Sequence, residues 1–197
     1  VEVSGIVRSL ASNLLKISND LRLLSSGPDA GIGELQLPAR QAGSSIMPGK
    51  VNPVIPEAVG QAALSMTAHD AAVLHASSLG NLELNQFMPL IADSLLTSLA
   101  LARHACRILA EHCVDGLQAN RARCSEHVAG ATATITALVD ALGYQTAQAI
   151  ATEALASGRT IRQIVLERKL MTSEEFDQAI SPAAVMQLGS RPENETT

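Results

Sequence analysis

Hydroxyl, ammonium and amide groups follow one another closely in one short segment near the first quarter of the sequence. Two hydroxyls, Ser44 and Ser45, lie between glycines that allow close backbone approach. The cation of Lys50 and the amide of Asn52 follow, and a helix is predicted to begin directly afterwards, with its positive dipole end toward this segment. The pattern indicates a loop that binds a carboxylate, although an ordinary Ser/Gly/Pro turn with one solvated lysine has a similar composition.

The segment lies in a long stretch that is too interrupted for regular structure. Residues 27–53 contain five glycines and four prolines. Long loops inside compact domains are usually functional. We therefore expect this loop to carry the functional side chains.

Long amphipathic helices are predicted on both sides of the loop, because apolar residues recur there every three or four positions. The first helix ends at Ser25, and its apolar stripe is Val3, Ile6, Leu10, Leu14, Ile17, Leu21 and Leu24. Three more cover approximately residues 54–76, 88–115 and 117–142. Such helices bury their stripes against each other, so we predict an all-α fold built on an elongated helical bundle.

The scale of the pattern changes after residue 143, where only short helices are predicted. Thr160 and Gln163, like Thr172 and Glu175, have the spacing of a capping box. We predict three parts: a section of a long-helix bundle over residues 1–143, with its functional loop at 43–53, a small helical C-terminal domain over 144–190, and a frayed tail over 191–197.

Composition excludes several classes of protein. The net charge is -5 and the 14 basic residues are scattered, so we predict no nucleic-acid partner. No apolar run approaches the roughly 20 residues that span a bilayer, and no signal peptide opens the chain, so we predict no membrane partner. The sequence lacks an initiator methionine and starts within a helical pattern.

The three cysteines, Cys106, Cys113 and Cys124, lack the CxxC spacing of metal and redox sites. We interpret them as reduced thiols of a cytoplasmic protein, with Cys113 buried and inert. Scattered histidines and cysteines on helices are more often packing or surface residues than metal ligands. We therefore expect neither a metal nor another cofactor.

Residues 43–53 read GSSIMPGKVNP and resemble, position for position, the GSSxMPxKxNP signature of the fumarase/aspartase superfamily. Residues 19–28, 80–85 and 160–170 resemble other segments of the same superfamily, so the resemblance spans nearly the whole chain. It implies the C-terminal portion of a longer lyase. One departure is Asp29, which stands where relatives generally have arginine.

The residues around the signature are more similar to the aspartate ammonia-lyase branch than to the fumarase branch. Residues 54–57 read VIPE, where fumarases usually have a Thr-Gln-Cys-Glu-like run, and Gln41 and Ala42 also fit the aspartase branch. The implied reaction is anti-elimination of ammonia from L-aspartate to give fumarate, through an aci-carboxylate carbanion. A class II fumarate hydratase is the nearest alternative, and an argininosuccinate or adenylosuccinate lyase is a weaker one.

The resemblance also implies roles for individual residues. Ser44 would be the catalytic base, Ser45 would stabilise the charge that develops on the adjacent carboxylate, and Lys50 and Asn52 would hold the other carboxylate. Relatives form homotetramers in which three subunits build each active site, and further site segments lie upstream. The chain alone is therefore expected to be inactive. A non-enzymatic alternative is a truncated helical module that only oligomerises.

Overall fold

The computed structural model describes residues 1–41, 47, 50–131 and 134–186, which form two compact units. The first unit is Val1–Asn120 and the second begins at Arg121. Within the described residues, the only named strands are β1 (Leu35–Gln36) and β2 (Gln118–Ala119). The prediction of an all-α fold is confirmed.

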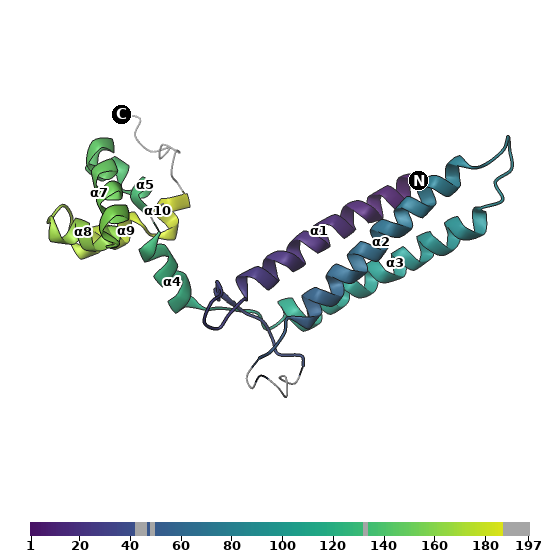
Figure 1. The fold of residues 1–197 in the computed structure, drawn as a ribbon, viewed down its shortest axis with the longest axis horizontal. Coiled ribbons are helices and arrows are strands. Elements are labelled where there is room, and N and C mark those ends of the chain that lie inside the picture. Colours follow the sequence, from purple (N-terminus) through teal and green to yellow (C-terminus); the bar gives the residue numbers. More distant parts are fainter. Residues whose placement is uncertain (42–46, 48–49, 132–133, 187–197) are drawn as a thin grey trace, which may run out of the picture. The chain divides into compact units, whose positions relative to one another are not determined.

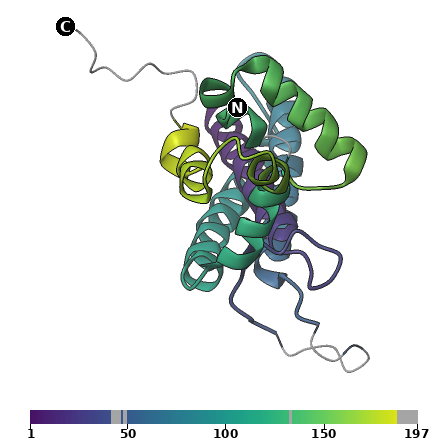
Figure 2. The ribbon, with the colours of Figure 1, turned by 90° about the vertical axis from the view of Figure 1, so that its left-hand side faces the viewer.

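Three long helices form the first unit: α1 (Glu2–Leu24), α2 (Val54–Ser78) and α3 (Met88–Leu109). Figures 1 and 2 show them side by side, with α2 packed along both others. Their core is rich in alanine, which lets the helix axes approach closely. Its buried members are Val7, Ala11, Leu14, Val59, Ala63, Met66, Ala102, Ala105, Leu109 and Cys113.

The buried face of α1 differs from the predicted one. Ser4, Val7, Ala11, Leu14 and Ser18 are buried, so the predicted stripe is correct at Leu14 but wrong for its four most exposed members. Those are Val3, Ile6, Leu10 and Ile17, which are 54%, 64%, 38% and 45% exposed in this chain. The small side chains of α1 face α2, because helices that pack closely leave no room there for larger ones.

A buried carboxylate links α1 to α2. Asp70, which is 7% exposed, accepts a hydrogen bond from the Ser4 hydroxyl at 2.6 Å. The Arg8 guanidinium lies 3.2 Å from its second oxygen. A charge removed from water is tolerated when it is paired and hydrogen-bonded in this way. These contacts favour one axial alignment of the two helices.

Ser18, unlike Asp70, is a buried polar residue without a hydrogen bond. Its side chain is fully buried and its hydroxyl has no hydrogen-bond partner. Leaving a buried hydroxyl unpaired costs about 1–3 kcal/mol. We therefore expect Ser18→Ala to raise the free energy of unfolding by about 1 kcal/mol in urea titrations followed by circular dichroism. Ser4→Ala is the matched control and should lower it, since Ser4 is bonded to Asp70. A loss of stability in both variants would contradict the prediction.

The long loop lies between α1 and α2, as predicted, and α2 begins directly after Pro53. Beyond α3 the chain forms a π-helical turn, η1 (Ala110–Val114), and then β2. β2 pairs antiparallel with β1, with Leu35 opposite Ala119. The pairing brings the middle of the loop next to the segment that follows α3.

The second unit consists of short helices. They are α4 (Arg121–Gly130), α5 (Thr134–Ala137), α6 (Val139–Leu142), α7 (Tyr144–Ser157), α8 (Ile161–Glu167), α9 (Ser173–Ala179) and α10 (Pro182–Met186). The prediction of one helix over residues 117–142 is wrong, because β2 takes up residues 118–119 and α4 ends at Gly130.

The boundary between the units falls after Asn120, whereas the sequence analysis placed it after residue 143. The reason is the core of the second unit, in which Leu138 packs with residues of α7, α8 and α9. Its other buried members are Ile150, Ala154, Ile161, Ile164, Val165 and Phe176. The tail predicted over 191–197 lies outside the described residues.

Both predicted capping boxes are confirmed at the starts of α8 and α9. The Thr160 hydroxyl accepts from the Gln163 amide, and the Gln163 side chain accepts from the Thr160 amide. Thr172 and Glu175 make the same reciprocal pair. These hydrogen bonds satisfy amides that have no partner within the helix. None of the helices in the described part of the chain is long and apolar enough to cross a bilayer.

Candidate functional site

The structure describes two of the four candidate site residues. Ser44 and Ser45 lie outside the described residues. Lys50 is exposed and Asn52 is half-buried, and both lie in the stem that leads into α2. The Lys50 amide donates to the Met47 carbonyl at 3.2 Å. Lys50 and Asn52 therefore both lie within four residues of the start of a long helix.

The start of α2 adds a positive electrostatic contribution to this stem. Pro53 is the N-cap and offers no side-chain acceptor to the amides of the first turn. The positive end of the helix dipole therefore lies at Pro53, three residues after Lys50. Glu57 in the first turn has the opposite charge, but the Arg22 guanidinium lies 3.8 Å from it. The arrangement suits an anion at the end of the stem.

The stem before the signature is anchored to the segment after α3. The Arg40 guanidinium donates to the backbone carbonyls of His112 at 3.0 Å and Glu111 at 3.3 Å, both in η1. The Asn120 side chain donates to the Gly33 carbonyl at 3.1 Å. These contacts join positions more than 70 residues apart, so no local pattern in the sequence predicts them.

Two segments of the loop border one small cavity beside Cys113: the first stem, residues 37–40, and the second stem, residues 50–53. Its volume is about 10 Å³, which leaves no room for a dicarboxylate, so we interpret it as a packing defect. The residues around it come from the first stem, the second stem and η1, and they include Leu37, Pro38, Arg40, Asn52, Pro53, His112 and Cys113. The π-helical turn therefore contacts the loop on both sides of the signature.

Cys113 is 1% exposed, which confirms the interpretation of a buried thiol. Burial raises the pKa of the Cys113 thiol above its ordinary value of 9.0, because the thiolate is the form that loses hydration. A thiol with a raised pKa is a poor nucleophile at neutral pH. Cys113 is therefore a packing residue between the stems.

The raised pKa of Cys113 predicts a pH dependence of stability. Above pH 9.0 the unfolded thiol loses its proton while the folded thiol keeps it, so the stabilisation is complete below 9.0 and decreases as pH rises further. We expect the advantage of the natural chain over Cys113→Ala, measured as free energy of unfolding, to shrink as the pH rises above about 9. Parallel pH profiles for the two proteins would contradict this.

Two other polar residues that could act as acid or base lie far from the stem. His75 is exposed in the last turn of α2, and Glu83 is exposed in the connection to α3. Lys50 and Asn52 lie at the opposite end of α2. Within one chain the structure does not bring these groups together. Among the described residues, no group of three or more His, Cys, Asp or Glu side chains is arranged to hold a metal ion.

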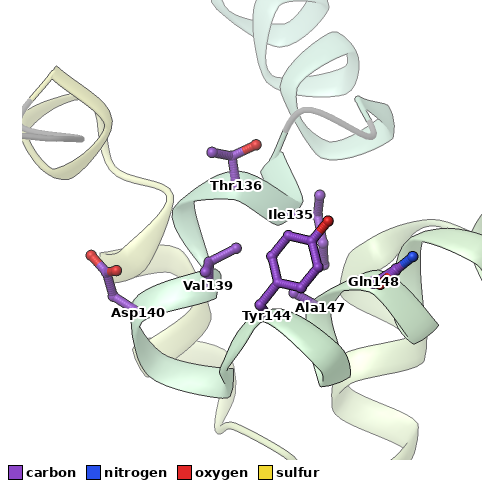
Figure 3. A pocket seen from close by; sticks show the side chains of 7 residues that line it. All are labelled: Ile135, Thr136, Val139, Asp140, Tyr144, Ala147 and Gln148. Atoms are coloured by element: carbon purple, nitrogen blue, oxygen red, sulfur yellow. The ribbon is translucent and has the colours of Figure 1, made fainter.

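A larger pocket of about 620 Å³ lies in the second unit, around the exposed ring of Tyr144 (Figure 3). Ile135, Val139 and Ala147 make its lining mainly apolar, and Asp140 supplies a negative charge. A dicarboxylate would be repelled by that carboxylate. This pocket therefore does not suit a diacid substrate.

Two protein-family models match this chain, one near each end. Residues 1–67 match the family model described as "Lyase", and residues 135–187 match the model described as "Fumarase C C-terminus". The chain is 46% identical to an aspartate ammonia-lyase of Helicobacter pylori over 182 residues, which are 92% of this chain and 39% of that protein. The chain belongs to the fumarase/aspartase superfamily.

Other superfamily members are similar over the same range. A class II fumarate hydratase of Pseudomonas putida is 42% identical over 189 residues, 96% of this chain and 41% of that protein. The crystal structure of a fumarate lyase:delta crystallin from Brucella melitensis matches with a TM-score of 0.86 at 46% identity, covering 93% of this chain and 39% of that one. The chain thus spans about two fifths of the length of these superfamily members.

Proposed function

We propose that the complete protein is an aspartate ammonia-lyase that converts L-aspartate into fumarate and ammonia. The observation that carries this proposal is the signature of residues 43–53, continued by VIPE at 54–57 at the start of α2. The 46% identity to the Helicobacter pylori aspartate ammonia-lyase supports the same branch. A class II fumarate hydratase is the second candidate, because the relative from Pseudomonas putida is 42% identical.

The proposed reaction begins when Ser44, as an alkoxide, removes a proton from the carbon next to the amine-bearing carbon. The electron pair of that C–H bond moves into the adjacent carboxylate, which becomes an aci-carboxylate. Hydrogen-bond donation by Ser45 stabilises this charge as it develops. The electrons then return to form the C=C bond while the C–N bond breaks and ammonia leaves with its electron pair. Fumarate remains bound at the other carboxylate by Lys50 and Asn52.

The charges of the described stem support this assignment. A diacid needs two anion sites, and catalysis needs donors where the transition state carries more charge than the substrate. The exposed ammonium of Lys50 and the dipole of α2 supply positive potential next to Asn52. Together they provide one of the two anion sites.

The length of α2 supports a site built from several copies of the chain. Lys50 and Asn52 lie before its first residue, whereas residues 80–85, which also resemble the superfamily, follow its last. A helix of 25 residues is about 37 Å long. One copy cannot bring both segments to a single small substrate. We propose that residues 80–85 act in the site of another copy, so that several copies complete each site.

Exposed apolar side chains on the long helices support a homotetramer. A contiguous apolar face on a single chain is typical of a protein contact surface. Large examples on the three helices are Val3, Ile6, Leu10, Ile17, Leu64, Leu74, Leu96 and Leu99. We propose that contacts between copies bury these faces. The three cysteines fit a reducing compartment, and we propose that the protein is cytoplasmic.

The proposal is tested by assaying the complete protein for two reactions. Ammonia release from L-aspartate is expected, and hydration of fumarate to malate is not expected at a comparable rate. Faster hydration of fumarate would assign the protein to the second candidate function. Absence of both reactions in a folded tetramer would overturn the proposal.

The 197-residue chain purified alone is expected to release no ammonia from L-aspartate. It spans 39% of the length of the Helicobacter pylori relative, and the resemblance puts further active-site segments in the remainder. The matched control is the complete protein under the same conditions. Ammonia release by the chain alone would show that the site needs nothing outside these residues.

A further inference from the structure

Arg40 lies four residues before the first serine of the signature, at the end of the first stem. Its guanidinium is exposed, yet it makes two hydrogen bonds to main-chain carbonyls of a distant segment. The acceptors, His112 and Glu111, are in the π-helical turn η1. A cation at a helix C-terminus is favourable, because the last carbonyls have no partner within the helix and carry the negative end of the dipole.

The same turn also borders the second stem. Arg40, His112 and Asn52 all line the cavity of about 10 Å³ that adjoins Cys113. Such a small space leaves little room for the stems to shift relative to each other. The backbone of Asn52 is in turn part of the entry into α2, because its carbonyl accepts from the Val54 amide at 2.9 Å. A movement of Arg40 relative to η1 would therefore change the position of Asn52.

We propose that Arg40 is a positioning residue for Asn52: by fixing the first stem to η1, it holds the Asn52 amide where the carboxylate of the substrate binds. This inference rests on the proposed function. Arg40 does not itself contact the reacting atoms. It acts through the packing of both stems against η1.

The contact requires arginine in particular. The planar guanidinium presents several N–H groups in a fixed geometry, so Nε and Nη2 reach two successive carbonyls at once. Lysine offers a single ammonium and can satisfy one of them well. Because Arg40 is exposed, its removal leaves no buried cavity, and the fold should survive the substitution. The variants therefore separate positioning from folding.

The experiment compares the complete protein with its Arg40→Ala and Arg40→Lys variants. With L-aspartate, Arg40→Ala should raise KM about tenfold and change kcat less than about threefold, since binding of a carboxylate is lost in both ground and transition states. Arg40→Lys should recover part of the loss. Arg103→Ala is the matched control, because Arg103 is exposed on α3 and its Nη2 contacts the neighbouring His104 at 3.3 Å. It should leave KM unchanged.

Amide hydrogen exchange of the same ligand-free proteins provides the second measurement. Arg40→Ala should speed exchange in the peptide that covers residues 50–57, while amides in the middle of α2 stay protected. A lowered kcat with unchanged KM, or faster exchange without a change in KM, would overturn the positioning role. So would unchanged exchange.

Failure of the proposed function would be recognised separately, because the natural protein would then not release ammonia from L-aspartate. If the natural protein instead converts malate, KM for malate is compared between the natural protein and the Arg40 variants. The exchange measurement needs no substrate, so it decides on the anchoring of the stem in either case.

Discussion

Ser44→Ala in the complete protein is expected to lower kcat for L-aspartate by at least about a hundredfold, because a positioned general base contributes about 10²–10⁴ to the rate. The melting temperature should not change, since serine and alanine differ by one hydroxyl. The measurement is steady-state ammonia release together with thermal unfolding followed by circular dichroism. This role rests on the superfamily signature, because Ser44 is outside the described residues.

Two further variants make the result specific. Ser45→Ala should also lower kcat, as expected for loss of one donor to a developing charge. Ser9→Ala is a control on α1, where the hydroxyl bonds only to the Gly5 carbonyl in the structure, and it should be active. Near-normal turnover by Ser44→Ala would remove Ser44 from the role of base, even if the protein is an aspartate ammonia-lyase.

Phe176→Ala is expected to destabilise the second unit by about 3–5 kcal/mol. Phe176 is 1% exposed and has the largest of the fully buried side chains. Its ring packs in the core of that unit, and the Arg162 guanidinium lies 5.8 Å from its centroid. Truncation would leave a large cavity in a unit of short helices, which has little other core to compensate.

Hydrogen exchange is the appropriate measurement, because two units need not unfold in a single transition. Amides of α8 and α9 should lose protection in Phe176→Ala, while those of α1 to α3 keep theirs. Phe87→Ala is the matched control: this half-buried residue precedes α3 in the other unit and should cost less. Equal loss of protection in both units of Phe176→Ala would mean that they unfold together.

Local patterns in the sequence predicted the local features of the fold correctly. The ends of α1 at Leu24 and of the loop at Pro53 followed from glycine and proline punctuation. The capping boxes at Thr160 and Thr172 followed from side chains three residues apart. Each of these features depends on neighbours in the sequence, so a single sequence contains the information that determines it.

The spacing of apolar residues does not tell whether an apolar side chain is covered by its own chain or by another protein surface. Ile6 and Ile17 have the spacing of a buried stripe, yet they are exposed here while Ser4 and Ser18 are buried. A hydropathy pattern does not distinguish surface that is covered within one chain from surface that another copy would cover. The proposed homotetramer would reconcile the two. The buried serines are compatible with close helix packing, which a hydropathy pattern does not detect.

The candidate site was only partly predictable for a similar reason. Lys50 and Asn52 could be proposed from the sequence because they belong to one continuous signature. The hydrogen bond of Arg40 to His112 could not be predicted, because it depends on a π-helical turn that no motif marks. The break after α3 was missed likewise, since the pairing of β2 with β1 is a contact between distant segments.

That strand pair also bears on the order in which the chain folds. The Asn120 side chain meets the Gly33 carbonyl across 87 positions of sequence, and contacts of such high contact order form slowly because a long loop must close first. Helices α2 and α3 are joined by a short connection and should assemble earlier. The stems that present Lys50 and Asn52 would then become ordered last. Nascent chains would therefore contain packed helices before they contain the ordered stem of Lys50 and Asn52.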